Sequence, residues 1–197
     1  MTRVIAGRAK GRRLQTPPGD GTRPTSDRVR EALFSSVESW CGSIEGVRFL
    51  DLYAGSGAIG LEAWSRGAGS ITFVESDRGA AALIAANAQT IGCEVAEVHQ
   101  MAVLHALARA PRHRFDVVFS DPPYPLSEAD LAADLDLLTD WIRPDALVVV
   151  ERSRRSPEPG WPETIVGERS KRYGETTLWY GRAAAPDDNV GPTNKGA

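Results

Sequence analysis

The order of apolar segments between residues 47 and 151 constrains the fold of this chain more than any other feature. Five strand-like runs alternate there with four segments of helical pattern. Strands that alternate with helices need crossover connections, which build a parallel sheet with helices on both faces. We expect strands at 47–52, 71–75, 94–99, 115–120 and 146–151, and helices after Ala58, Gly79, Ala102 and Glu128.

The pattern changes after Glu151. A polar loop leads to two strand-like segments, 163–168 and 174–180, with little sequence between them. Such a pair is antiparallel and would complete a seven-stranded, Rossmann-like α/β sheet whose last strand is antiparallel. Residues 183–197 show no apolar periodicity and are expected to form a disordered tail.

The first 40 residues predict a small extension ahead of the main domain at 41–182. Segments 4–7 and 12–14 fit a short hairpin. Thr25, Ser26 or Asp27 can cap a following helix, because Val29, Leu33, Val37 and Trp40 recur on one face of it. The extension is basic: residues 1–30 carry a net charge of +6, whereas the whole chain carries −3. A basic arm on an acidic body predicts contact with nucleic acid. Its basic residues are Arg3, Arg8, Lys10, Arg12, Arg13, Arg23, Arg28 and Arg30.

The overall composition is that of an ordinary soluble protein, with 42% apolar and 25% charged residues. The N-terminus lacks the apolar segment of a secretory signal, and no run is long enough to span a membrane. Cys41 and Cys93 match no disulfide or metal spacing, and the three histidines lack ligand spacing. We therefore expect a cytoplasmic protein that needs no metal.

The most informative motif is Asp121-Pro122-Pro123-Tyr124, which directly follows the buried strand at 115–120. The Asp121 carboxylate and the Pro122 carbonyl could each accept one N–H of an exocyclic amine and turn its lone pair toward a methyl donor. Proline suits this role because its φ is fixed and it has no competing N–H. Tyr124 could stack on the base, a contact worth roughly 1–3 kcal/mol. The motif predicts methyl transfer to an exocyclic nitrogen of a nucleobase.

A glycine-rich loop follows the first strand of the sheet. Asp51 precedes Gly55, Gly57 and Gly60, and Glu75 ends the second strand. The glycines permit close approach of a ligand, and the next helix offers free N–H groups. This spacing fits either a nicotinamide dinucleotide or S-adenosylmethionine, with Glu75 at the ribose. Asp51, placed to hold a cationic amino group, and the Asp121 motif favour S-adenosylmethionine.

These segments together closely resemble the RsmD family, bacterial methyltransferases that modify N2 of one guanine in 16S ribosomal RNA. The resemblance covers about residues 4–180. It is carried by Arg12-Arg13-Leu14, the block from Thr22 to Phe34, the loop from Asp51 to Gly60, Phe73 to Asp77, the Asp121 motif and Tyr173-Gly174. The block from Thr22 to Phe34 is specific to that family, whereas the glycine loop and the Asp121 motif also occur in DNA adenine methyltransferases.

The resemblance implies Asp51, Gly55 and Gly57 at the methionine part of the cofactor, Glu75 at its ribose, and Asp121 with Tyr124 at the target guanine. The family often has an acid that reaches the cofactor adenine where this chain has Met101, before Ala102. Met101 can pack on the adenine but is a weak acceptor, so backbone groups are the alternative.

We therefore hypothesise a monomeric, S-adenosylmethionine-dependent guanine-N2 methyltransferase whose substrate is 16S ribosomal RNA, naked or within an assembling small subunit. Lys171, Arg172 and Tyr173, expected in the turn before the last strand, are further candidates to border the substrate. Three alternatives stay open at this point: a DNA adenine-N6 methyltransferase, a nicotinamide-dependent oxidoreductase and a non-catalytic ribosome-assembly factor.

Overall fold

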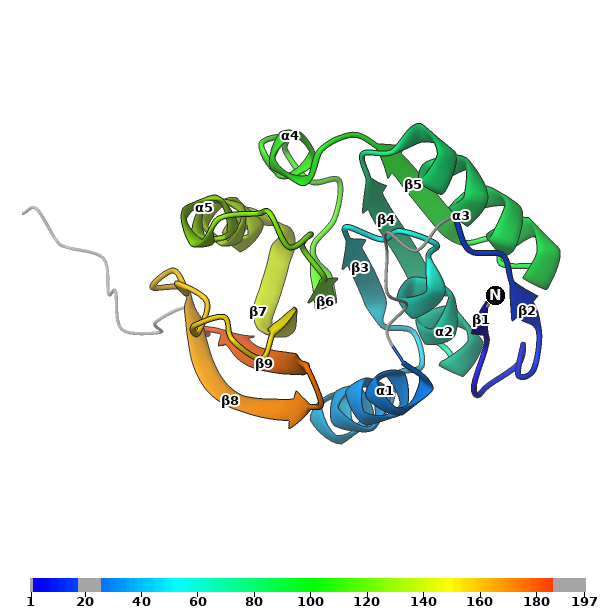
Figure 1. Cartoon of the computed structure of the whole chain (residues 1–197), viewed down its shortest axis with the longest axis horizontal. Coiled ribbons are helices and arrows are strands. Elements are labelled where there is room, and N and C mark those ends of the chain that lie inside the picture. The colour runs from blue at the N-terminus through cyan, green and yellow to red at the C-terminus, as the bar shows by residue number, and fades with distance from the viewer. Residues whose placement is uncertain (1, 18–25, 186–197) are drawn as a thin grey trace, which may run out of the picture.

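A twisted seven-stranded sheet forms the centre of the molecule (Figure 1). The computed structural model describes residues 2–17 and 26–185. The strand order is β5-β4-β3-β6-β7-β9-β8; the first five of these strands are parallel, and β9 is antiparallel to both its neighbours. This confirms the predicted α/β sheet with an antiparallel last strand. The strands are β3 Arg48–Leu52, β4 Ser70–Glu75, β5 Ala96–Gln100, β6 Phe115–Ser120, β7 Ile142–Ser153, β8 Ile165–Tyr173 and β9 Thr176–Ala183.

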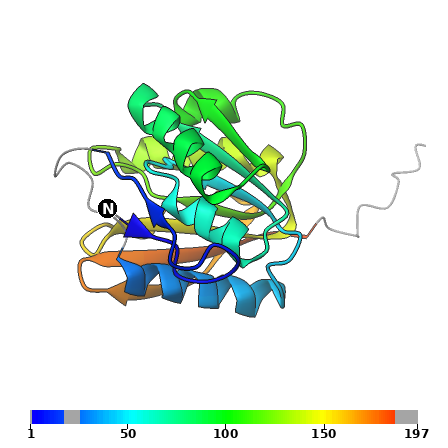
Figure 2. The same ribbon diagram turned by 90° about the vertical axis from the view of Figure 1, so that its right-hand side faces the viewer.

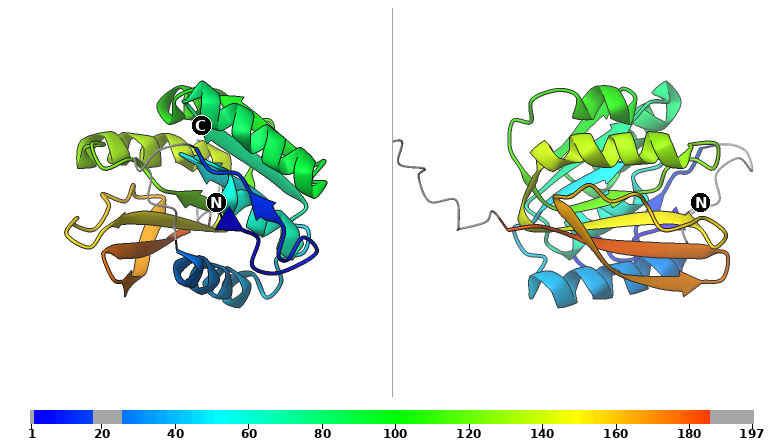
Figure 3. Two further views of the ribbon diagram at one scale, coloured as in Figure 1. Left: turned by 45° about the vertical axis from the view of Figure 1, so that its right-hand side comes forward. Right: turned by 90° about the vertical axis from the view of Figure 1, so that its left-hand side faces the viewer.

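Helices cover both faces of the sheet, because both faces of its parallel strands carry apolar side chains. Helices α1 to α3 pack on one face, and α4, α5 and the short 3-10 turn η1 pack on the other, as Figure 3 shows for α1 and α5. Ser26 caps α1, one of the three residues predicted for that role. The helices are α1 Asp27–Cys41, α2 Ala58–Arg66, α3 Arg78–Ile91, α4 Val103–Leu107, α5 Glu128–Leu138 and η1 Thr139–Trp141. Within the described residues, no helix is long and apolar enough to cross a membrane.

The N-terminal arm is packed on the body of the molecule, beside α2 (Figure 2). Its paired strands are only two residues long, β1 Thr2–Arg3 and β2 Arg13–Leu14, so the strand expected at 4–7 was wrong. The reason is that Ile5 and Ala6 donate their backbone N–H groups to the buried carboxylate of Glu62 on α2, at 2.7 and 2.9 Å, and not to a partner strand. A Cβ at Gly7 would lie 1.8 Å from the carbonyl oxygen of Ser65, so the close contact requires glycine.

The last two strands form a hairpin around Gly174, whose φ of 61° suits a tight turn. Strand β8 extends to Tyr173, so Lys171, Arg172 and Tyr173 lie in this edge strand and not in the turn where we expected them. Strand β9 continues through the buried Ala183, where the tail was expected to begin. The remainder of the predicted tail, residues 186–197, lies outside the described residues.

Candidate active site

Four acidic residues lie in a row at the carboxyl edge of the sheet, one on each of four adjacent strands or directly after it. Glu75 ends β4, Asp51 is in β3, Asp121 follows β6, and Glu151 is near the end of β7. Asp51 is in register with Phe119, which is in register with Val149. Because side chains alternate along a strand, positions two residues beyond Phe119 and Val149 project to the same face as Asp51. We call these four side chains the carboxylate row.

Asp51 sits at the base of the row and is almost fully buried. One of its oxygens accepts the backbone N–H of Gly60 at 2.9 Å, which ties β3 to the first turn of α2. Burial raises the pKa of Asp51 to about 8, and the charge of Glu75 adds to the rise, whereas the Gly60 hydrogen bond opposes it. A buried carboxylate with so high a pKa is suited to pair with a cation, such as an amino group.

The glycine loop between β3 and α2 has two functions. Gly55 and Gly57 have φ values of 54° and 75°, in the left-handed region that glycine adopts most readily, and a Cβ on Gly55 would meet no atom within 4 Å. Gly60 serves packing instead, because a Cβ there would lie 2.4 Å from the ring of Phe73 on β4. The loop therefore leaves its backbone open near Gly55 while α2 packs tightly on the sheet.

Glu75 organises the neighbouring backbone as well as offering a carboxylate. Its two oxygens accept the N–H groups of Gly55 and Asp77, both at 2.8 Å. Each carboxylate oxygen has a second acceptor site, so these bonds leave room for ribose hydroxyls. Asp77 in turn caps α3 by accepting from the N–H of Ala80.

A mostly apolar cavity of about 250 Å³ opens between α4, α5 and the loops after β3 and β4. Ala102, which the sequence analysis placed at the cofactor adenine, lines this cavity, whereas Met101 packs on the core beside it and is not part of the lining. The sequence did not single out two polar residues that line it, Tyr53 and Asp134. Tyr53 has a φ of 57° and donates its hydroxyl to Asp134 at 2.5 Å. The lining of the cavity consists of Tyr53, Ser76, Ala102, Val103, Leu104, Leu126, Asp130, Ala133 and Asp134.

A signal for Asp134 was present in the sequence. It is a buried acid at helical spacing from the buried Leu131, Leu135 and Leu138 on α5. An acid on an apolar helix face needs a partner, and Tyr53 provides it. Burial raises the pKa of Asp134, and the hydrogen bond from Tyr53 lowers it.

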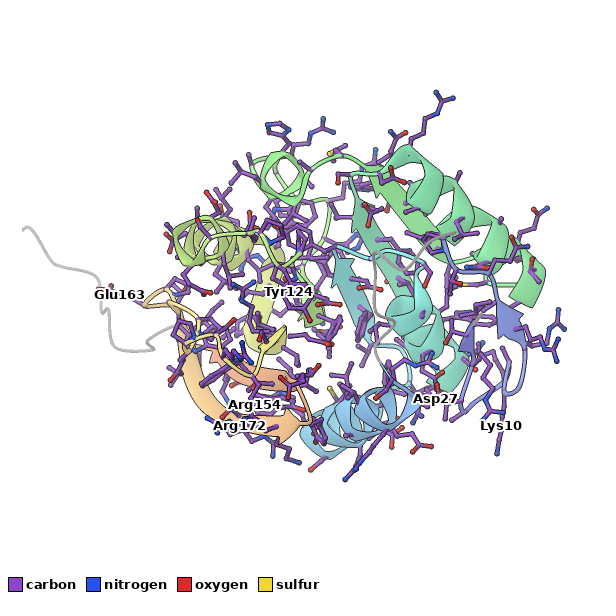
Figure 4. All side chains as sticks on the ribbon, in the orientation of Figure 1. Lys10, Asp27, Tyr124, Arg154, Glu163 and Arg172 are labelled. Atoms are coloured by element: carbon purple, nitrogen blue, oxygen red, sulfur yellow. The ribbon has the colours of Figure 1, made fainter. Side chains whose placement is uncertain are left out.

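The Asp121-Pro122-Pro123-Tyr124 motif leads from β6 into a turn that begins at Tyr124. Asp121 is partly buried, and the N–H of Leu126 donates to the carbonyl of Pro123 at 2.9 Å. Burial raises the pKa of Asp121 well above its usual range, and the charges of Glu151 and Asp51 raise it further, whereas Arg152 lowers it. Tyr124 is 79% exposed, and Figure 4 shows it beside β6. An exposed aromatic ring next to a hydrogen-bond acceptor is suited to stacking a flat, amine-bearing base.

The structure separates the basic residues of the arm. The tip of the arm lies at the amino edge of the sheet, because Arg8 donates its N–H to Ser65 near the end of α2 and Arg12 reaches the carbonyl of Thr90 near the end of α3. Lys10, in the same turn, points away from Tyr124 (Figure 4). Arg13 is exposed on β2.

Two of the predicted RNA-binding residues, Arg3 and the exposed Arg28, lie close to the first turn of α1. Arg30 was wrongly expected to be available to RNA: it is fully buried, pairs with Asp27 at 2.6 Å and donates to the carbonyl of Arg3. Its position one turn into an amphipathic helix turns it inward. Arg23 lies outside the described residues.

The fold and the carboxylate row define a class of protein. A seven-stranded sheet with one antiparallel strand, a glycine loop after the first strand of the domain and an acid at the end of the second is the arrangement of the Rossmann-like methyltransferases. Residues 2–182 match the model of the family described as "Conserved hypothetical protein 95". The chain belongs to this family, which is the RsmD family.

Relatives and solved structures agree with this assignment. The chain is 40% identical to ribosomal RNA small subunit methyltransferase D of Haemophilus influenzae over 79% of its length and 80% of that protein, and 36% identical to the Escherichia coli protein of the same name over 88% and 85%. Among solved structures, a putative methyltransferase from Escherichia coli superposes with a TM-score of 0.82 at 34% identity, covering 93% of this chain and 98% of that one. A putative RNA methyltransferase from Pyrococcus horikoshii shares the fold, with a TM-score of 0.69 at 19% identity and coverage of 89% and 92%.

Proposed function

We propose that this protein transfers the methyl group of S-adenosylmethionine to the exocyclic N2 of one guanine in 16S ribosomal RNA. The observation that carries the proposal is the adjacency of two sites at one edge of the sheet. A buried carboxylate with a raised pKa, Asp51, lies beside a base-binding motif, Asp121 to Tyr124. Family membership supports ribosomal RNA as the substrate.

The residues at the glycine loop fit S-adenosylmethionine. Asp51 is suited to the cationic amino group, the open backbone at Gly55 and Gly57 to the methionine part, and Glu75 to the ribose hydroxyls. The mostly apolar cavity lined by Ala102 suits an adenine ring. Asp130 and Asp134 also line this cavity. When bound, the cofactor supplies a methyl group activated by a sulfonium.

The chain's own residues orient the acceptor. The Asp121 carboxylate and the Pro122 carbonyl each accept one N–H of the target amine, which directs the nitrogen lone pair toward the methyl donor. Tyr124 stacks on the base and offsets the few kcal/mol needed to remove it from a helical stack. The amine loses its proton to the Asp121 carboxylate or to water during or after transfer.

The RNA backbone is expected at the exposed arginines around this edge. Arg3, Arg13 and Arg28 of the N-terminal extension stay candidates for phosphate contact, and we add the exposed Arg154 and Arg172 near the end of the β8–β9 hairpin. Figure 4 shows Arg154 and Arg172 together at that end. We propose that the protein acts as a monomer in the cytoplasm, on naked RNA or on an assembling small subunit.

Replacing Asp121 by alanine tests the proposal. We expect turnover on small-subunit RNA to fall by roughly 10²-fold or more, as for the loss of one positioned hydrogen-bonding group. Binding of S-adenosylhomocysteine, measured by calorimetry, should persist. Near-normal turnover in this variant would exclude the proposed role of Asp121. Mass mapping of small-subunit RNA from cells that lack the protein would identify the modified guanine.

A further inference from the structure

Asn87 on α3 joins two segments that lie far apart in the sequence. Its side chain is buried, and its amide oxygen accepts the backbone N–H of Gln15 at 2.8 Å. Its amide nitrogen donates to the carbonyl of Gln15 at 2.9 Å and to the carbonyl of Ser56 at 3.0 Å. Gln15 directly follows β2 of the N-terminal arm, and Ser56 lies in the glycine loop. One buried side chain therefore connects the arm to the loop proposed to receive the cofactor.

The three partners fix the orientation of the Asn87 amide. An asparagine side chain has one acceptor oxygen and two N–H donors, and here it faces one N–H and two carbonyls. Turning the amide over would set its oxygen against both carbonyls. Two of the three hydrogen bonds go to the backbone of Gln15. When Gln15 leaves, the amide is free to rotate away from Ser56.

The Ser56 carbonyl belongs to a peptide unit that depends on such support. Glycines flank Ser56 on both sides, and Gly55 and Gly57 have φ values of 54° and 75°. Glycine reaches other backbone conformations at little cost, so this peptide can rotate easily unless it is held. It is held at both ends, because its carbonyl accepts from Asn87 and its N–H donates to the carbonyl of Ala54 at 2.8 Å. Loss of the Asn87 hydrogen bond therefore loosens the glycine loop.

The arm is an element that can leave the body without unfolding of the sheet. Strands β1 and β2 are only two residues long, and a hairpin of that size adds little stability of its own. Its docking contacts include Glu62 and Ser65 on α2, and Thr90 and Asn87 on α3. Segments held in this way open locally at a lower free energy than global unfolding.

We propose that Asn87 couples docking of the N-terminal arm to binding of the cofactor. The docked Gln15 orients the amide, the amide holds Ser56, and the glycine loop keeps the conformation that receives the methionine part. Coupling of two binding equilibria is reciprocal, so cofactor binding in turn stabilises the docked arm. Arg13 is exposed two residues before Gln15. The loaded protein therefore presents this arginine to RNA in a fixed position. The inference rests on the proposed function, which places the cofactor at the glycine loop and RNA at Arg13.

Two glycines of the arm provide a matched pair of substitutions. A Cβ at Gly7 would lie 1.8 Å from the carbonyl oxygen of Ser65 and should release the arm, whereas a Cβ at Gly11 would meet no atom within 4 Å. Their φ values are 79° and 81°, so alanine adds similar backbone strain at both positions. Calorimetry with S-adenosylhomocysteine measures the effect on the cofactor site. We expect Gly7→Ala to weaken binding by roughly 3- to 10-fold, the range for one hydrogen bond, and Gly11→Ala to leave it unchanged.

A double-mutant cycle tests whether this effect passes through Asn87. Asn87→Leu keeps the size of the side chain and removes its three hydrogen bonds, so S-adenosylhomocysteine should bind roughly 10-fold more weakly. Adding Gly7→Ala to this variant should weaken binding no further. An equal further loss in both backgrounds would overturn the role of Asn87. So would wild-type affinity in Gly7→Ala when protease shows that its arm is released.

The reciprocal measurement uses the wild-type protein and does not depend on how the variants fold. Saturating S-adenosylhomocysteine should slow protease cleavage within the arm by the same factor of roughly 3 to 10. In Asn87→Leu it should not. Equal cleavage of the wild-type arm with and without the ligand, or equal slowing in Asn87→Leu, would overturn the coupling alone. Failure of the wild-type protein to bind S-adenosylhomocysteine would instead refute the proposed function, and the inference with it.

Discussion

Replacing Asp51 by asparagine should stabilise the empty protein while it weakens cofactor binding. The carboxylate has a pKa of about 8 in the folded protein, against an ordinary value of 3.8. Between about pH 4 and 8 the folded state therefore holds a proton at Asp51 that the unfolded state releases. The sign follows directly: stability falls as the pH rises through this window, by about 1.4 kcal/mol per pH unit. Asparagine does not titrate, and its oxygen can still accept from the N–H of Gly60.

The size of this pH effect can be measured as a difference between the wild type and Asp51→Asn. From about pH 5 to pH 8, the free energy of unfolding of the wild type should fall by about 3 to 4 kcal/mol relative to Asp51→Asn. Urea unfolding at several pH values measures this difference, with Asp136→Asn, an exposed position on α5, as the matched control. Affinity of the Asp51 variant for S-adenosylhomocysteine should fall by roughly 10- to 100-fold through loss of the charged partner. Parallel pH profiles for wild type and Asp51→Asn would mean that Asp51 titrates normally and that burial does not dominate it.

Three further substitutions test other parts of the molecule. Glu62→Ala removes the acceptor for the backbone N–H groups of Ile5 and Ala6, which hold the arm on α2. The free energy of unfolding in urea should fall by about 3 kcal/mol, and protease should cleave the arm faster. Unchanged values would mean that other contacts hold the arm. Asp134→Asn should reduce the preference for S-adenosylhomocysteine over S-inosylhomocysteine, which lacks the adenine amine, by roughly 10-fold in calorimetry. An unchanged ratio of the two affinities would mean that the adenine amine does not contact Asp134. Arg172→Glu should weaken RNA binding and lower its salt dependence by about 0.7 per lost phosphate contact, whereas Lys10→Glu at the opposite edge should change both much less. Equal effects of Arg172→Glu and Lys10→Glu would show that RNA also contacts the tip of the arm.

The sequence predicted the sheet well because its strands are short, apolar and separated by helices of clear period. Strand β6 has the predicted bounds, and β3, β4 and β5 differ by one or two residues. Prediction was less accurate where polar residues form an edge strand. The segment from Arg169 to Arg172 has no apolar pattern and reads as a turn, yet it pairs with β9 through backbone hydrogen bonds that are independent of side-chain type.

The sequence predicted those residues of the site that lie beside a recognisable motif. Asp51 and Asp121 stand next to glycine and proline motifs, which mark them in the sequence. Asp134 has no such motif and is marked only by its helical spacing from Leu131 and Leu138, and the place of Glu151 in the carboxylate row follows from the order of strands far apart in the chain. For the arm, charge alone was misleading: it suggested one RNA-binding surface, but the contacts with Glu62, Ser65 and Thr90 hold the arm against α2 and α3 toward the carboxyl ends of these helices.

The distribution of charge by depth explains how a chain with a net charge of −3 can act on a polyanion. Asp51 and Asp121 of the carboxylate row are buried or partly buried, and burial and mutual repulsion raise their pKa values and so reduce their negative charge before ligands bind. Arg154 and Arg172 at the same edge are exposed. Under the proposed function, we expect phosphates to meet these arginines, and a cation or the N–H groups of an unstacked base to reach the acids. We expect the same arrangement to keep the phosphate backbone away from the acids, so that the base alone reaches them.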